Sequence, residues 1–219
     1  MNNIEIASLI DHTVLAQTAP HETRADACAF AVANKCAAVC ISPFFVAECA
    51  QRLAGSGVKV CTVIGFPHGV MSTGAKVAEA RIAMEDGAEE LDMVVNIAKV
   101  KDGDWDYVRR DIGAVTGAVH GAGRKVKVIF ENCFLDDSEK IKLCEICSEL
   151  RCDWVKTSTG FGSGGATLED VALMRAHVAP GVQIKAAGGI RTLEQVLAFH
   201  AAGASRIGCS RTADVLAQS

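Results

Sequence analysis

The amino-acid sequence predicts a single (β/α)8 barrel domain formed by residues 1–219. Eight short runs rich in β-branched and apolar residues alternate with longer segments of helical period, as in a parallel sheet built from βα units. Eight is also the strand number of such a barrel. An open doubly wound sheet shows the same alternation. Polar residues near the carboxyl ends of most runs favour the closed barrel, which carries its functional groups there.

The eight predicted strands follow one another without a linker, and their carboxyl ends are 22 to 36 residues apart, which leaves room for one helix in each interval. Helix starts are indicated by Ser42 before a proline and by the N-cap patterns at Thr167 and Thr192. The strands are predicted over residues 10–15, 37–42, 59–66, 90–96, 125–132, 153–158, 182–187 and 205–210.

Composition limits the classes of function. The net charge is −4, and no run of Lys and Arg forms a basic patch, which argues against a surface for nucleic acid or anionic membranes. The chain has no signal-like amino terminus and no apolar run of membrane-spanning length. We therefore expect a cytoplasmic protein that acts on a small molecule.

The chain has ten cysteines, which we expect to be reduced and mostly buried, because a chain of this size and location does not need a disulfide framework. Cys144, Cys147 and Cys152 come closest to metal-ligand spacing, but no second pair completes a zinc site, so helix packing is the preferred interpretation. Cys40, near the end of its strand, is interpreted as an inert wall thiol.

Histidines do not indicate a catalytic metal either. Only His12 and His68 lie near the carboxyl ends of predicted strands, and a catalytic zinc site needs three protein ligands. The sequence therefore predicts no metal and no cofactor.

Five lysines lie in predicted strands, where lysine is uncommon. Lys59, Lys125 and Lys127 lie at or near strand starts, where their side chains could extend to solvent at the bottom rim. Lys156 and Lys185 lie instead toward the carboxyl ends of neighbouring strands, so they should share one space. Two ammonium groups there should lower the pKa of at least one, which would activate an amine for Schiff-base chemistry. The alternative is a pair of structural lysines that bind a carboxylate or a helix end.

Three carboxylates lie in the same region. Asp92 lies among apolar residues of its strand and needs a cation, for which the two lysines are candidates. Asp11 and Glu131 are interpreted mainly as salt-bridge scaffolding of the barrel mouth.

Glycine-rich loops follow the last three strands. Loops at this place in a barrel often bind a phosphate through backbone N–H groups, with side chains such as Arg191 as further donors. The predicted phosphate-binding residues are Gly160, Gly188, Gly189, Gly208, Ser210 and Arg211.

At this point the sequence resembles the 2-deoxyribose-5-phosphate aldolases. The matching segments run in order from residue 10 to about residue 210: IDHT, VCISP, VIGFPHG, ELDMVVN, KVIFEN, DWVKTSTGFG, IKAAGGIRT and RIGCS. The resemblance implies reversible cleavage of 2-deoxy-D-ribose 5-phosphate to glyceraldehyde 3-phosphate and acetaldehyde, in the catabolism of deoxyribose phosphate.

The resemblance also implies roles for three residues. Lys156, in the KTSTG motif, would form the Schiff base, and Lys185 and Asp92 would donate and accept protons. On this interpretation Lys185 also depresses the pKa of Lys156. Family members form dimers or tetramers, so we expect a homo-oligomer.

Two departures from the family pattern stand out. Arg211 occupies a position where many members have a small residue after the serine of the GxS motif, which changes the expected phosphate contacts. Some members place a tyrosine from a carboxyl-terminal tail in the site, whereas the only tyrosine here is Tyr107. Proton transfer would then depend on Asp92, Lys185 and water.

Two other functions remain open. A non-catalytic phosphosugar-binding barrel would need the glycine loops but not the lysine pair with its aspartate. A different Schiff-base enzyme, such as a transaldolase or another aldolase, would lack the KTSTGFG and KAAGGIRT context.

Overall fold

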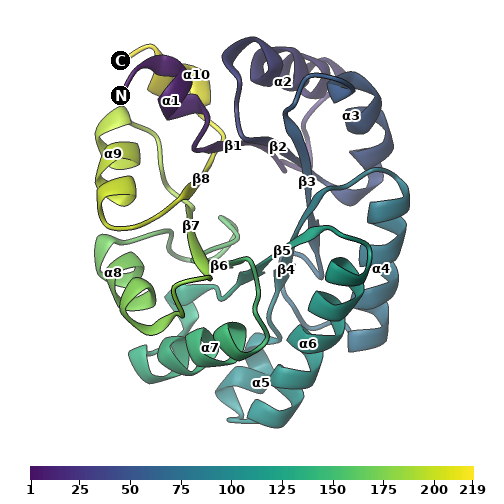
Figure 1. The fold of residues 1–219 in the computed structure, drawn as a ribbon, viewed down its shortest axis with the longest axis vertical. Coiled ribbons are helices and arrows are strands. Elements are labelled where there is room, and N and C mark those ends of the chain that lie inside the picture. Colours follow the sequence, from purple (N-terminus) through teal and green to yellow (C-terminus); the bar gives the residue numbers. More distant parts are fainter.

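Eight parallel strands form a ring around the centre of the molecule in the computed structural model, which describes residues 1–219 (Figure 1). Each strand pairs with its neighbours in chain order, and β8 pairs with β1 through Gly208 opposite Asp11, which closes the barrel. The strands are β1 (Ile10–Val14), β2 (Ala38–Ile41), β3 (Lys59–Ile64), β4 (Glu90–Val94), β5 (Lys125–Ile129), β6 (Trp154–Lys156), β7 (Gln183–Ala187) and β8 (Arg206–Cys209). The predicted closed barrel and its eight strands are confirmed.

Helices surround the ring of strands (Figure 1). The two chain ends lie side by side, where the Asn3 side chain donates to the carbonyl oxygen of Leu216 at 3.4 Å. The helices are α1 (Asn3–Ala7), α2 (His21–Asn34), α3 (Val46–Leu53), α4 (Thr73–Glu85), α5 (Ile97–Lys101), α6 (Trp105–Gly121), α7 (Asp137–Glu149), α8 (Leu168–His177), α9 (Leu193–Ala201) and α10 (Thr212–Leu216), with short 3-10 helices η1 (Pro43–Phe45) and η2 (Asn132–Phe134). None of the helices combines the length and the apolar character that crossing a membrane requires.

The strands separate two kinds of interior because their side chains alternate between the two faces of the sheet. On β4, Leu91 and Met93 point outward into the main apolar core between the sheet and the helices. Glu90 and Asp92 point the other way, toward the barrel axis, and both are buried. The outer layer therefore holds the fold together by apolar packing, and the inner layer is free to carry charge.

Local caps fix where two of the site-bearing loops end. Thr167 and Thr192 cap α8 and α9 through their side chains, as predicted. Ser42 differs, because it precedes the 3-10 helix η1 and makes no side-chain cap, and α3 begins only at Val46.

The cysteines are all free, and all but Cys133 are buried, as the sequence predicted. Cys144, Cys147 and Cys152 belong to the main apolar core at α7 and the turn after it, which confirms the packing interpretation.

Candidate active site

The two site lysines and Asp92 meet inside the barrel. Lys156 ends β6, and Lys185 is its register partner on β7. Asp92 reaches both from β4, because its Oδ2 accepts from Lys156 Nζ at 2.8 Å and from Lys185 Nζ at 2.7 Å. All three side chains are buried. The structure thus brings together the three residues that the sequence singled out for chemistry.

A second tier of charges lies next to this group. Asp11 on β1 accepts from Lys185 Nζ at 2.5 Å and from Arg206 at 2.5 Å. Arg206 also binds Glu90 with both terminal nitrogens, at 2.9 and 3.1 Å. The salt-bridge role expected of Asp11 is confirmed. Arg206 and Glu90 were not singled out from the sequence, although both fall on inward positions of their strands.

Lys127 corrects one sequence prediction. We expected its side chain to extend to solvent, but it is fully buried, with Nζ at 2.8 Å from Asp92 and 2.7 Å from Glu90. The reason is register: Lys127 lies opposite Asp92 on the neighbouring strand, and both point to the barrel axis. Lys125, two residues earlier, is exposed at the start of β5, as predicted.

The network holds Asp92 and Lys185 in their charged forms. Burial alone would raise the pKa of Asp92, but the ammonium groups of Lys127, Lys156 and Lys185 lower it well below its usual value. Burial alone would lower the pKa of Lys185, but the carboxylates of Asp11 and Asp92 outweigh burial and raise it. If crowding lowers the pKa of one lysine of the pair, Lys185 is not that lysine.

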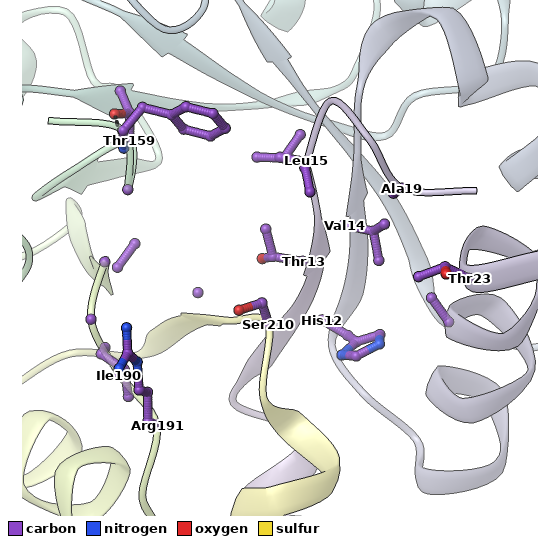
Figure 2. A pocket seen from close by; sticks show the side chains of 18 of the residues that line it. His12, Thr13, Val14, Leu15, Ala19, Thr23, Thr159, Ile190, Arg191 and Ser210 are labelled. Atoms are coloured by element: carbon purple, nitrogen blue, oxygen red, sulfur yellow. Dashed lines mark hydrogen bonds between the residues drawn. The ribbon is translucent and has the colours of Figure 1, made fainter. Parts of the chain in front are cut away.

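A cavity of about 680 Å³ opens at the carboxyl ends of the strands. Thr13, Leu15 and Ser210 face Thr159 and Arg191 across it (Figure 2). Of the buried charged residues of the barrel interior, only Lys156 lines this cavity, and Asp92 and Lys185 lie beneath it. A ligand in the cavity can therefore contact the amine of Lys156 directly. It can exchange protons with Asp92 and Lys185 only by way of Lys156 or of a small molecule such as water.

The predicted phosphate-binding glycines gather on one side of the cavity, on the loops after β6 and β7 and on β8. Gly188 has φ 89°, in the left-handed region that glycine adopts readily. A Cβ at Gly165 would lie 2.2 Å from the Gly188 carbonyl oxygen, so the two loops pack backbone to backbone. The lining residues from the predicted set are Gly160, Gly188, Gly189, Gly208 and Ser210.

Arg211 is the exception in that set. Its side chain is exposed and binds Asp214 at 3.0 Å, in the first turn of α10, and it does not line the cavity. The physical reason is that Arg211 is the N-cap residue of α10, and the aspartate three residues along that helix pairs with it. Arg191 lines the cavity instead.

Glu131 was expected to form a salt bridge, and it forms none. Its buried carboxylate accepts from the backbone N–H of Thr159 at 3.0 Å and from the hydroxyl of the same residue. The partner is thus a loop residue that lines the cavity.

His12 lines the cavity on the outer side of β1, where its Nδ1 lies 2.8 Å from the Thr212 hydroxyl (Figure 2). Burial lowers the pKa of His12 to about 4, so its imidazole is neutral at pH 7. His68 is exposed, and Cys40 is buried in the wall of the barrel.

Two groups of side chains have ligand atoms close enough for a metal ion. They are Cys40, Cys61 and Asp92, and Asp11, Cys61 and Glu90. In both groups the carboxylates already bind lysine or arginine nitrogens, so these donors fit a network of ion pairs.

Comparison with known proteins gives one family and close relatives. Residues 6–213 match the model of the family described as DeoC/LacD family aldolase. Two proteins named deoxyribose-phosphate aldolase are each 53% identical: one from Rhodopirellula baltica, covering 98% of this chain and 89% of that protein, and one from Thermococcus gammatolerans, covering 96% and 94%. The tetrameric deoxyribose phosphate aldolase structure from Aeropyrum pernix superposes with a TM-score of 0.92 at 30% identity, over 99% of this chain and 91% of that one.

Proposed function

The chain belongs to the DeoC/LacD family of aldolases, and we propose that it reversibly cleaves 2-deoxy-D-ribose 5-phosphate to D-glyceraldehyde 3-phosphate and acetaldehyde. The observation that carries this proposal is the placement of Lys156. It is the one buried interior lysine that lines the cavity, and it contacts Asp92, which also binds Lys185. A free amine at this place is suited to attack an aldehyde.

The reaction follows from an amine that reaches C1 of the open-chain sugar. Nζ of Lys156 adds to the C1 carbonyl, and loss of water gives an iminium. The C3 hydroxyl then loses its proton, the C2–C3 bond breaks, and its electron pair moves into the iminium to give an enamine. Glyceraldehyde 3-phosphate leaves, the enamine is protonated at C2, and hydrolysis releases acetaldehyde and the free amine.

The charge balance of the interior supports Lys156 as the amine that reacts. The interior network contains three carboxylates, of Asp11, Glu90 and Asp92, and four cationic side chains. The cationic side chains therefore outnumber the carboxylates by one. Lys156 binds one carboxylate, whereas Lys127 and Lys185 each bind at least two.

We propose that Asp92 and Lys185 donate and accept protons from their place beneath the reacting carbons. Asp92 Oδ2 accepts hydrogen bonds from both lysines, so it can take a proton from one lysine and pass a proton to the other. Because both groups lie beneath the cavity, a water molecule is the simplest carrier to C2 and to the C3 hydroxyl.

We propose that the phosphate binds near Ser210 and the glycines of the β6, β7 and β8 loops, with Arg191 as its cation. Arg191 and Ser210 both line the cavity, which supports this placement. Replacing Arg191 by Ala should raise KM for the phosphorylated sugar about tenfold or more while KM for unphosphorylated deoxyribose changes little. The matched control is Arg211→Ala, which should leave both KM values near wild type. Equal effects of Arg191→Ala on the two sugars would refute the placement.

We also propose a homo-oligomer, a dimer or a tetramer, that acts in the cytoplasm. The tetrameric relative from Aeropyrum pernix supports the assembly. Sedimentation of the purified chain measures its oligomeric state directly.

Cleavage itself is tested by incubating the purified chain with 2-deoxy-D-ribose 5-phosphate and measuring both aldehyde products. We expect equal amounts of acetaldehyde and glyceraldehyde 3-phosphate, and no products from Lys156→Leu. A wild-type chain that binds the sugar phosphate without cleaving it would be a phosphosugar-binding barrel instead.

A further inference from the structure

Glu131 has an unusual backbone conformation for its place in the fold. It lies two residues after β5 and has φ 60° and ψ 62°, in the left-handed region. The other non-glycine residues with positive φ, Lys35 and Arg151, follow helices α2 and α7, where this conformation is a common way to end a helix. Glu131 instead follows a strand, so surrounding contacts must offset the strain.

Both oxygens of the Glu131 carboxylate accept hydrogen bonds from the same residue, Thr159. Its Oε1 accepts from the Thr159 backbone N–H at 3.0 Å, and its Oε2 accepts from the Thr159 hydroxyl. The side chain is buried, yet the ion pairs of the barrel interior do not include it. A buried carboxylate without a cation is costly, so these two hydrogen bonds are what keep it in place.

Thr159 connects Glu131 to the loop residues that line the cavity. Its hydroxyl also accepts from the Phe161 backbone N–H at 2.9 Å, and Thr159, Gly160 and Phe161 all line the cavity. The loop lies directly on the carboxylate, because a Cβ at Gly162 would come within 3.1 Å of Glu131 Cδ.

The same loop supports the loop after β7. The Ala166 backbone N–H donates to the Gly188 carbonyl oxygen at 3.1 Å, and Gly165 packs against the same group. Glu131 therefore lies under a segment that contacts the cavity at Gly160 and the neighbouring glycine turn at Gly188.

We propose that Glu131 is a positioning residue: its carboxylate holds the loop of residues 157–166 in place and thereby sets the affinity for the phosphorylated substrate. This inference rests on the proposed function. Glu131 takes no part in bond making at Lys156. Acetaldehyde needs only the amine of Lys156 to form an iminium, whereas the sugar phosphate also needs the loop that Glu131 supports.

Two substitutions separate the carboxylate from the backbone strain. Glu131→Gly permits the left-handed backbone and removes the carboxylate, and Glu131→Gln keeps the size and an oxygen acceptor for the Thr159 N–H. Glu85→Ala, on the exposed face of α4, is the control. We expect Glu131→Gly to raise KM for 2-deoxyribose 5-phosphate about tenfold or more, as for loss of a charge-assisted hydrogen bond. Glu131→Gln should recover most of this loss, and the control should match wild type.

A second measurement excludes general damage to the site. Borohydride trapping of acetaldehyde on Lys156 in Glu131→Gly should proceed within about twofold of the wild-type rate, because Lys156 Nζ binds Asp92 and the Glu131 carboxylate binds Thr159 instead. Thr159→Val should raise KM as Glu131→Gly does, and the double variant should be no worse than either single one.

Three outcomes would overturn the proposal: unchanged KM in Glu131→Gly, additive effects in the double variant, or loss of acetaldehyde trapping in parallel with KM. A failure of the proposed function would look different, because the wild-type chain itself would then neither cleave the sugar phosphate nor trap acetaldehyde on Lys156.

Discussion

Lys156 and Lys185 occupy the same register level on neighbouring strands, yet their surroundings differ. Lys185 lies between Asp11 and Asp92 and is shut off from the cavity, and its raised pKa keeps it an ammonium at neutral pH. Lys156 binds Asp92 alone and faces the cavity. The difference between the two lysines therefore lies in access and in the number of carboxylates.

Removing the Lys185 ammonium should abolish turnover. Lys185→Leu removes one of the two lysines that pair with both Asp11 and Asp92, Lys127 being the other, and it removes a proton carrier, so we expect kcat to fall more than about a hundredfold. Raising the pH should not restore it, because a higher pH does not supply the proton carrier that the variant lacks. Steady-state kinetics across pH measures this, with Lys125→Leu as the exposed strand-lysine control. Near-normal activity of Lys185→Leu would contradict the role.

Three of the interior charged residues could be identified from the sequence, and a fourth, Lys127, was misplaced. Lys156, Lys185 and Asp92 could be found because they are charged residues at inward positions near strand ends. Lys127 was placed wrongly because its distance from the bottom rim depends on strand tilt and stagger, which the sequence does not show. Its inward partner Asp92 on the neighbouring strand was an available signal.

At the scale of elements, the eight strands could be predicted because each is a short β-branched run between helical segments. Their carboxyl ends were placed too late in several cases, as at β5, predicted to residue 132 and ending at Ile129. Phe130 continues the apolar pattern past Ile129 and packs in the main apolar core, and the next two residues, Glu131 and Asn132, are also buried although they lie outside the strand. Loop contacts such as that between Glu131 and Thr159 could not be predicted, since they join segments far apart in the chain.

One ion pair joins two outer helices. Lys76 on α4 is fully buried, donates to Asp111 on α6 at 2.6 Å and also donates to the carbonyl oxygen of Val94 at the end of β4. Lys76→Met strands a buried carboxylate and should lower the free energy of unfolding by about 3–5 kcal/mol. Lys76→Met combined with Asp111→Leu should recover most of that loss, because no charge is left buried.

Urea denaturation of the two variants measures the difference. If the double variant is as unstable as Lys76→Met alone, packing rather than the stranded charge explains the loss.

At the scale of the whole molecule, the burial of His12 should make the free energy of unfolding fall as the pH is lowered. Burial lowers the pKa of His12 to about 4, whereas an unfolded histidine titrates near 6.5. As the pH falls, this histidine therefore takes up a proton in the unfolded chain at a higher pH than in the folded protein. The stabilising contribution is complete above about pH 6.5 and is lost as the pH falls to about 4, amounting to about 3 kcal/mol. The lowered pKa values of Asp11 and Asp92 act only below that range, because unfolded aspartate titrates near 3.9.

The measurement is the free energy of unfolding at several pH values between 7 and 4 for wild type and His12→Gln. The other histidines are exposed, so the slope in this range should be much smaller in the variant. Equal slopes in the two proteins would contradict the assignment to His12.

The whole molecule joins an apolar outer layer to a charged inner layer, and the central claim is that this interior presents one reactive amine, on Lys156. Borohydride reduction in the presence of acetaldehyde, followed by peptide mapping, tests it most directly. We predict an N-ethyl group on Lys156, and none on Lys127 or Lys185. An adduct on Lys185, or no adduct on the Lys156 peptide, would contradict the account.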